Sequence, residues 1–181
     1  MIWDEKAKNC LKMSSKASKS ELDDADRTIL SMLQQNGNLS NAQLAEHLSL
    51  SVTPCWRRLK RLQDEGYITG YQANLNRRKL GLDVLAFVQL RFMVVTDASV
   101  KHFEEIIRVH PSVLSCHKVT GEADYMLQVV AKDLDAYSDF VEALLRQIPA
   151  ISMMHSSLAM REIKAVNQFP VAPVLSVART W

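Results

Sequence analysis

The sequence contains few cysteines, and they lie far apart. Its 181 residues include only Cys10, Cys55 and Cys116, which form no CxxC pair and are too few and too scattered for a disulfide framework. We therefore expect a reducing compartment. Cys55 is predicted to be a small buried helix residue and Cys116 a strand residue, with redox sensing as the alternative. The five histidines have no ligand spacing to these cysteines, so no metal site is predicted.

The sequence also lacks the signatures of catalysis and of membrane insertion. It contains neither a P-loop nor a GxGxxG motif, and its Ser, His and Asp residues do not assemble into a recognisable triad. No apolar run approaches the length of a membrane span, and the N-terminus has no signal-peptide core. We therefore predict a cytoplasmic protein that is not an enzyme, holds no cofactor and has no membrane partner.

What the sequence does contain is a short basic segment in a nearly neutral chain. The formal net charge is +2, yet residues 51–80 include seven basic and two acidic residues, which gives +5. The preceding residues 21–50 include one basic and five acidic residues, which gives −4. A confined basic segment of this kind indicates a local anionic partner and not general adhesion to polyanions.

Two short helices are predicted in the acidic segment. Acidic residues at 23, 24 and 26 precede the first, where they favour the positive end of a helix, and Gly37 follows its end. The second begins with a capping box in which Ser40 caps the helix and Gln43 reaches back to it. This helix is expected to end near Leu48.

A third helix is predicted after a tight turn. Ser51 or Thr53 can cap it, Pro54 suits its first turn, and it should end near Gly66. Its apolar face consists of Cys55, Leu59 and Leu62. Three short helices with a tight turn between the second and third indicate a helix-turn-helix domain, in which the third helix contacts the DNA.

The third helix carries basic residues on the side away from its apolar face. Such a run is usually a solvated helix face, but its position in a helix-turn-helix predicts DNA contact instead. We assign Lys60 and Arg58 to phosphates, and Arg57 and Thr53 to base edges. Trp56 either contacts a DNA sugar or packs on the hinge. The complete set of predicted DNA-binding residues is Ser51, Thr53, Arg57, Arg58, Lys60 and Arg61.

The second half of the chain predicts a different kind of domain. Its strands are expected at 85–95, 113–120, 125–131 and 151–163, and its helices at 100–110 and 137–148. The order βαββαβ is that of a ferredoxin-like fold, an antiparallel sheet with two helices on one face. The class is therefore α+β. The other face of the sheet needs a partner, and we expect it to form a dimer.

The predicted organisation has five parts. They are a flexible tail at 1–20, the helix-turn-helix domain at 21–70, a hinge at 71–82, the ferredoxin-like ligand-sensing and oligomerisation domain at 83–164, and a C-terminal tail at 165–181. Residues 67–82 are expected to combine a strand with the hinge. Met13 is a possible alternative start.

The sequence resembles the Lrp/AsnC family of bacterial and archaeal regulators. The resemblance rests on LDDADRTIL, on LSNAQLAEHLSLSVTPCWRRLKRLQDEGYI, on the hinge ending in LGLD and on TGEADY, which together span residues 22 to about 164. It implies a winged or wing-like helix-turn-helix joined to a ferredoxin-like regulatory domain, in dimers that assemble into octamers. The long N-terminal tail and Trp56, where many relatives carry leucine, depart from the family pattern.

The resemblance also implies an effector site at the hairpin near residue 121. Taken alone, Gly121 suits a turn with positive φ, Asp124 is a common turn former, and Tyr125 fits the start of a buried strand. In the family, however, this GxxDY loop lies at the effector site. Loop N–H groups can hold a carboxylate and Asp124 can accept from an ammonium group, so an amino acid is the predicted effector. The implied effector-binding residues are Gly121, Asp124, Tyr125 and Ser156.

We therefore predict a sequence-specific transcription regulator that responds to an amino acid and associates with the nucleoid. Its partners would be a palindromic double-stranded operator and further copies of the chain. Met154 and Ser156 stand where threonines are frequent in the family, which leaves the effector's identity open. The alternative is a nucleoid-organising protein of the same fold without an essential ligand. An enzyme with a regulatory domain is a third hypothesis, which has no catalytic half to support it.

Overall fold

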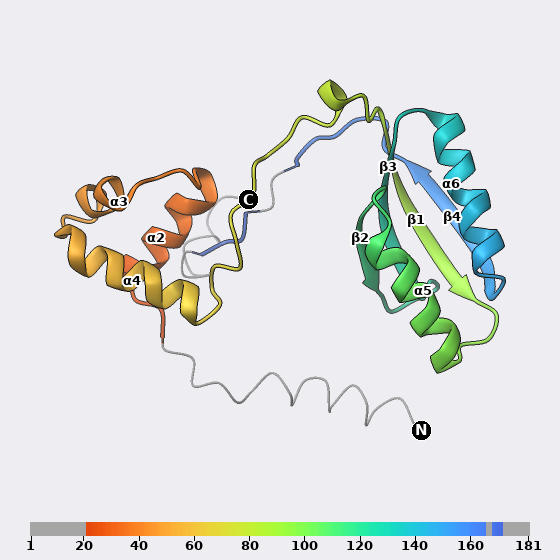
Figure 1. The fold of residues 1–181 in the computed structure, drawn as a ribbon, viewed down its shortest axis with the longest axis horizontal. Helices are drawn as coiled ribbons and strands as arrows, with labels where there is room; N and C mark the ends of the chain where they lie inside the picture. Colours follow the sequence, from red (N-terminus) through yellow and green to blue (C-terminus); the bar gives the residue numbers. More distant parts are fainter. Residues whose placement is uncertain (1–20, 166–167, 172–181) are drawn as a thin grey trace. The chain divides into compact units, whose positions relative to one another are not determined.

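The structure is a computed structural model that describes residues 21–165 and 168–171. The described residues form two compact units, 21–73 with 168–171 and 74–165. The predicted tail at 1–20, and residues 166–167 and 172–181 of the predicted C-terminal tail, lie outside the described residues. The helices of the first unit and the sheet and helices of the second are drawn in Figure 1.

The N-terminal unit consists of three helices, α2 (Asp24–Gln35), α3 (Asn41–His47) and α4 (Val52–Asp64). The predicted capping box at α3 is present, because Ser40 accepts from the Gln43 N–H and the Gln43 side chain accepts from the Ser40 N–H. A second capping box, which the sequence analysis did not identify, starts α2. The apolar core of the unit consists of Ile29, Leu44, Ala45, Cys55 and Leu62.

The turn between α3 and α4 is tight. Ser49 adopts a left-handed conformation with φ 53°, and the Leu50 N–H donates to the Ala45 carbonyl across the turn. Ser51 then occupies the N-cap position of α4 without a side-chain cap bond. At the other end, Gly66 turns the chain out of the helix with φ 77°. A left-handed residue of this kind commonly terminates a helix, and glycine adopts it without a steric penalty.

The strand predicted within residues 67–82 is absent, and that prediction is wrong. This stretch, which the structure describes completely, contains only the 3-10 helix Arg78–Leu80. Tyr67 and Ile68 pack against the N-terminal core, while residues 69–76 are exposed. The described part of this unit contains no other strand to pair with, and an unpaired strand leaves its backbone groups unsatisfied.

A short C-terminal segment, residues 168–171, lies on α2. The Gln34 side chain accepts a hydrogen bond from the Phe169 N–H at 2.7 Å and donates one to the Phe169 carbonyl at 3.1 Å. Arg27 donates to the Val171 carbonyl at 2.9 Å. Residues 27 and 34 are two helical turns apart, so they lie on the same face of α2. This part of the predicted tail therefore belongs to the N-terminal unit.

The second unit is a four-stranded antiparallel sheet with two helices. Its strands are β1 (Val84–Phe92), β2 (Val113–Lys118), β3 (Tyr125–Ala131) and β4 (Ile151–Leu158), in the order β2-β3-β1-β4. The helices are α5 (Asp97–Val109) and α6 (Leu134–Gln147), and both cover the same face of the sheet (Figure 1). The predicted α+β class and ferredoxin-like βαββαβ order are confirmed.

The core of this unit lies between the sheet and the two helices. Val88 and Leu90 of β1 point into it with Phe103 of α5 and Phe140 of α6. The rings of Phe92, Phe103 and Tyr125 contact one another, with centroids 4.6 to 5.7 Å apart. Alternate residues of each strand point to the other face, which neither helix covers.

The last strand is shorter than predicted. The expected strand 151–163 ends at Leu158, whose partner on β1 is Ala86, close to the first residue of β1. The Ala159 N–H still donates to the Leu85 carbonyl, and the ladder stops there. Because a strand needs a neighbour to satisfy its backbone groups, the start of β1 at Val84 sets the end of β4.

Candidate DNA-binding surface and effector region

The first turns of α4 place the predicted base-contacting residues outside the core. Cys55 and Leu62 are fully buried against α2 and α3, whereas Thr53 and Arg57 are exposed. At 100° per residue, Thr53 and Arg57 lie on the outermost ridge of the helix, opposite its apolar face. The geometry thus agrees with the face that helical periodicity assigned to these residues.

Two of the predicted DNA-binding arginines form ion pairs within the unit. Arg58 donates to Asp23 at 2.5 Å and to Asp26 at 3.0 Å. Arg61 donates to the second oxygen of the Asp26 carboxylate. The prediction treated both arginines as DNA ligands and did not foresee these partners. The pairs reduce the charge that Arg58 and Arg61 offer to a phosphate.

Asp26 is the residue on which this network depends. It is completely buried, and it is the one buried charged residue in the part of the chain that the structure describes. Its carboxylate also accepts the Asp23 N–H, which completes the capping box of α2. The spacing of two aspartates three residues apart was a signal for that box. The pairing with α4 had no signal in the sequence, because it depends on tertiary packing.

The electrostatics of the network follow from these contacts. The Asp26 backbone N–H, followed by the Arg58 guanidinium, lowers the pKa of Asp23 below its usual value of 3.8. The carboxylates of Asp23 and Asp26 in turn raise the pKa of Arg58. Asp23 and Arg58 are therefore charged at neutral pH, and their ion pair helps to fix the side of α4 that faces α2.

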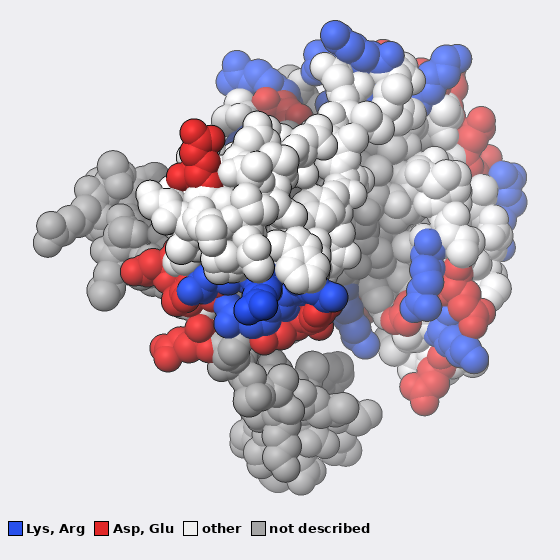
Figure 2. All heavy atoms as spheres, turned by 60° about the vertical axis from the view of Figure 1, so that its left-hand side comes forward, with Lys and Arg blue, Asp and Glu red and all other residues white. Residues whose placement is uncertain are grey.

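Arg57 and Lys60 are the cations of α4 that the network leaves free. Among the described residues neither has an acidic partner within ion-pair distance. The Lys60 ammonium lies 5.3 Å from the centroid of the Trp56 ring, over its face. On the surface of the N-terminal unit, Lys and Arg side chains gather in a band bordered by Asp and Glu side chains (Figure 2).

The structure brings only some of the predicted effector residues together. Gly121 lies in the turn between β2 and β3 with φ 119°, so the expected positive φ is confirmed. Asp124 follows in the same turn. Its carboxylate accepts the Phe92 N–H at 2.8 Å, and its own N–H donates to the Leu90 carbonyl. These bonds connect the hairpin to the end of β1, which is a structural role.

Tyr125 and Ser156 lie apart from each other. Tyr125 is buried on β3, and its hydroxyl donates to Glu104 at 3.4 Å. Ser156 lies on β4, with β1 between the two strands, and its hydroxyl hydrogen-bonds to that of Tyr137 at 2.6 Å. Within one copy of the chain these residues do not form a single cluster.

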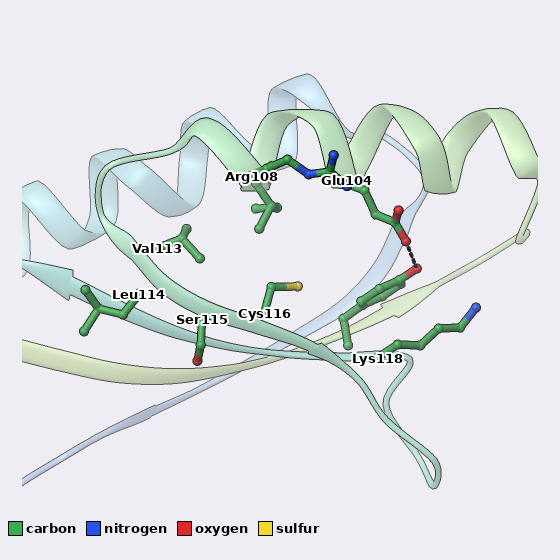
Figure 3. Close-up of a pocket in the computed structure, with 9 residues that line it drawn as sticks. Glu104, Arg108, Val113, Leu114, Ser115, Cys116 and Lys118 are labelled. Carbon is green, nitrogen blue, oxygen red and sulfur yellow. Dashed lines mark hydrogen bonds between the residues drawn. The ribbon is translucent and has the colours of Figure 1, made fainter. Parts of the chain in front are cut away.

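An open pocket of about 360 Å³ lies between α5 and β2, next to Tyr125. Glu104 and Arg108 line it from α5, and Cys116 and Lys118 line it from β2 (Figure 3). It thus presents one carboxylate and two cations around a partly apolar floor. The sequence does not predict this pocket, because Glu104 and Lys118 are ordinary surface residues in their own elements.

The neutral groups of the pocket are held in their protonated forms. Burial, followed by the nearby Glu104 carboxylate, raises the pKa of Cys116 to about 11. The same two causes raise the pKa of Tyr125 to about 12. The Cys116 thiol is therefore a poor nucleophile at neutral pH. Burial also raises the pKa of Cys55 on α4.

Two further properties concern the described residues as a whole. Their His, Cys, Asp and Glu side chains do not gather into a group that could hold a metal ion. No helix among them is long and apolar enough to cross a membrane.

Comparison with known proteins agrees with this two-part architecture. Residues 22–69 match the winged helix-turn-helix DNA-binding family, and residues 85–169 match the Lrp/AsnC ligand binding domain. The fold and these matches define a transcription regulator with a DNA-binding domain and a ligand-binding domain. The chain belongs to the Lrp/AsnC family.

The alignments with individual relatives span almost the whole length of each relative. The DNA-binding transcriptional activator DecR of Escherichia coli is 37% identical over 83% of this chain and 99% of its own. The Bkd operon transcriptional regulator of Pseudomonas aeruginosa is 41% identical over 79% of this chain and 94% of its own. A transcriptional regulator of Neisseria meningitidis, solved in complex with L-methionine, is 38% identical with a TM-score of 0.80, over 83% and 97% of the two chains.

Proposed function

We propose that this regulator binds double-stranded DNA through the outward ridge of α4 and that an amino acid bound to the second unit changes its affinity for DNA. Its place of action would be the cytoplasm, at the nucleoid. The observation that carries the proposal is that the four basic residues of α4 fall into an ion-paired set and a free set. Arg58 and Arg61 pair with the acids of α2, whereas Arg57 and Lys60 remain free on the exposed surface. A helix held on one side and cationic on the other suits insertion into the major groove.

The side chains of α4 differ in what they offer to DNA. Arg57 lies in the N-terminal half of the helix, and its two-pronged donors match a guanine edge. Thr53 lies one turn before it and suits a second base edge. Lys60 suits a phosphate, as does Ser51 at the N-cap. Arg58 and Arg61 take part through the donors that their ion pairs leave available.

The DNA-binding proposal is tested with Arg57→Ala in the full chain. We expect the variant to lose sequence preference in a footprinting titration while its unfolding temperature hardly changes, because Arg57 is exposed. Arg146→Ala on α6 is the matched control, since that arginine is also exposed and forms an ion pair with Glu142 one turn away. Retained preference in Arg57→Ala would refute the assignment. Wild-type binding of equal strength on every sequence would favour the nucleoid-organising alternative.

The uncovered face of the sheet supports self-association. Phe87 and Met153 alternate with the core residues Val88 and Met154, and their side chains are 41% and 39% exposed. Burying such a face against a second copy removes apolar surface from water. We infer a dimer through this face, its further assembly into an octamer, and a roughly palindromic operator. Light scattering of wild type and Phe87→Asp tests the dimer, and equal masses at micromolar concentration would contradict it.

An amino acid suits the charges near the β2–β3 turn. An amino acid offers a carboxylate and an ammonium group, and the pocket beside Tyr125 presents the Lys118 and Arg108 cations and the Glu104 carboxylate. The relative that was solved with L-methionine supports this ligand class. The other candidates for the same site are Gly121, Asp124 and Ser156. In that case the Asp124 carboxylate would accept hydrogen bonds from both the Phe92 N–H and the ligand.

Calorimetry with L-methionine, followed by the other amino acids, tests the effector and locates its site. If the pocket holds the ligand, Glu104→Gln weakens binding while Asp124→Ala changes mainly stability. If the β2–β3 turn holds the ligand, Asp124→Ala weakens ligand binding and Glu104→Gln does not. Asp124→Ala then also flattens the ligand-induced change of DNA affinity in a gel-shift titration, while ligand-free DNA affinity persists. If no amino acid binds the wild type, the amino-acid part of the proposal is wrong.

A further inference from the structure

Two large apolar side chains are exposed on α4 itself. Val52 is 50% and Trp56 is 45% exposed, and they lie one helical turn apart. Neither belongs to the buried core cluster of the N-terminal unit. Helical periodicity places them on the flank of α4 opposite to Arg58 and Arg61, beside the ridge of Thr53 and Arg57. Exposed apolar side chains next to a binding ridge indicate contact with a partner.

The orientation of Trp56 is defined by its neighbour Lys60. The ammonium group lies 5.3 Å from the ring centroid, so one face of the indole carries a cation that suits a phosphate. The rest of the exposed indole is available to an apolar group at the same depth as Arg57. In the major groove the apolar group that distinguishes one base from another is the C5-methyl of thymine. Arg57 and Lys60 have no apolar surface of comparable size to recognise it.

We propose that Trp56, with Val52 beside it, is a specificity-determining residue that packs against the C5-methyl group of a thymine next to the base contacted by Arg57. This inference rests on the proposed DNA-binding function of α4. It adds a thymine preference to the guanine preference that an arginine alone would give. Trp56 would also hold Lys60 toward the neighbouring phosphate, so that a single side chain would serve both specificity and affinity.

The experiment measures whether the indole and the methyl group depend on each other. A random-core duplex pool is selected with the full-length wild type, and the enriched site is synthesised with each thymine replaced singly by deoxyuridine, which removes only the methyl group. For wild type we expect one such replacement to weaken binding about threefold to fivefold, the effect of one buried methyl group. Trp56→Ala should bind the intact site less well and be insensitive to that replacement.

Two further variants serve as controls. Trp56→Leu keeps an apolar side chain, so it should retain most of the sensitivity to the thymine methyl group. Arg57→Ala, which is expected to lose sequence preference, should bind every duplex weakly and should not distinguish thymine from deoxyuridine. Because Trp56 lies outside the core, Trp56→Ala should unfold at nearly the wild-type temperature, which thermal denaturation checks.

Several results would overturn the inference. If Trp56→Ala is as sensitive to deoxyuridine as wild type, another residue recognises the methyl group. If it weakens binding equally on every sequence, Trp56 contacts the sugar-phosphate backbone, and if it binds like wild type, Trp56 does not contact DNA. These results leave the DNA-binding function intact when Arg57→Ala still impairs binding. A wild type that enriches no site in the pool would refute the sequence-specific function and this inference together.

Discussion

The two units of this regulator are stabilised by different kinds of core. The core cluster of the regulatory unit consists of 14 buried apolar residues, with the rings of Phe92, Phe103 and Tyr125 in mutual contact. Among its described residues, the DNA-binding unit has five buried apolar residues and one buried carboxylate, Asp26, which contacts two arginines of α4. The sheet domain is therefore an apolar scaffold, whereas the position of the recognition helix depends on ion pairs as well as on apolar packing.

This difference suits what each unit does. An apolar core tolerates small adjustments, because packing contacts have little directionality. Hydrogen-bonded ion pairs fix the rotation of a helix about its axis, since a turn of α4 would separate Arg58 and Arg61 from their partners. The proposed contact of Arg57 with a base edge needs that rotation to be fixed. In this proposal the network positions α4 for DNA recognition.

Removing a ring from the regulatory core should give the largest effect. Phe103 is fully buried and contacts two other rings, so Phe103→Ala should destabilise that unit by about 3–5 kcal/mol. Calorimetry of the full chain should show a lowered transition for this unit. Phe103→Leu, which keeps most of the volume, is the control and should cost much less. Equal costs for both variants would mean that the core relaxes around the missing ring.

Removing the buried carboxylate should give the next largest effect, and in the other unit. Asp26→Ala removes the acidic partner of Arg61 and one of the two partners of Arg58, and since both arginines are about one-third exposed, we expect a cost of about 2–3 kcal/mol, somewhat below that of breaking a fully buried pair. Asp24→Ala is the matched control, because Asp24 is exposed in the same helical turn. Denaturant unfolding measures both, and an Asp26→Ala loss no larger than the control's would contradict a positioning role.

The same comparison explains what could be predicted from the sequence. Helix caps such as Ser40–Gln43 and the alternation of the sheet strands are local signals, and the fold class follows from their order. The partners of Arg58 and Arg61 lie more than 30 residues away on another helix, so local patterns did not identify them. The strand predicted near residue 67 failed for a similar reason, because propensity does not supply a partner strand.

The effector region shows the same limit. The positive φ of Gly121 was predictable, since the turn between two strands demands it. The pocket beside Tyr125 depends on α5 lying against β2, which brings Glu104 and Lys118 to one hollow. When residues of two different elements face each other in the fold, the local sequence pattern of each element does not predict that they will. Site prediction from one sequence therefore succeeds for single helices and fails for surfaces built from several elements.

Acidification should weaken the DNA-binding unit through Asp23. Because the folded-state pKa of Asp23 is below its usual value of 3.8, the charged form contributes stability above that pH and loses it as the pH falls through the folded pKa. Asp23→Asn keeps a capping side chain but no charge, so it should be less stable than wild type at pH 5, and the difference should shrink as the pH falls through the folded-state pKa of Asp23. Urea titrations across this range measure the difference. A constant difference at all pH values would exclude the charge as its cause.

The smallest effect is expected where the C-terminal segment lies on α2. The Gln34 amide makes two hydrogen bonds to the backbone of Phe169, but the Phe169 side chain is 80% exposed and contributes little packing. Since water replaces such bonds easily, Gln34→Ala should cost about 0.5–1 kcal/mol of stability. Gln35→Ala, one residue along on the exposed side of the helix, should cost less.

Hydrogen exchange gives the sharper measurement of this contact. The Phe169 amide donates to Gln34, so its exchange should be slowed in wild type and in Gln35→Ala, and should accelerate in Gln34→Ala. Amides in the middle of α2 should be unaffected, because their bonds are within the helix. If the Phe169 amide exchanges at the rate of an unstructured peptide in wild type, the segment does not stay on α2 in solution. The apolar core and the ion pairs of the three helices would then stabilise the DNA-binding unit without a contribution from this segment.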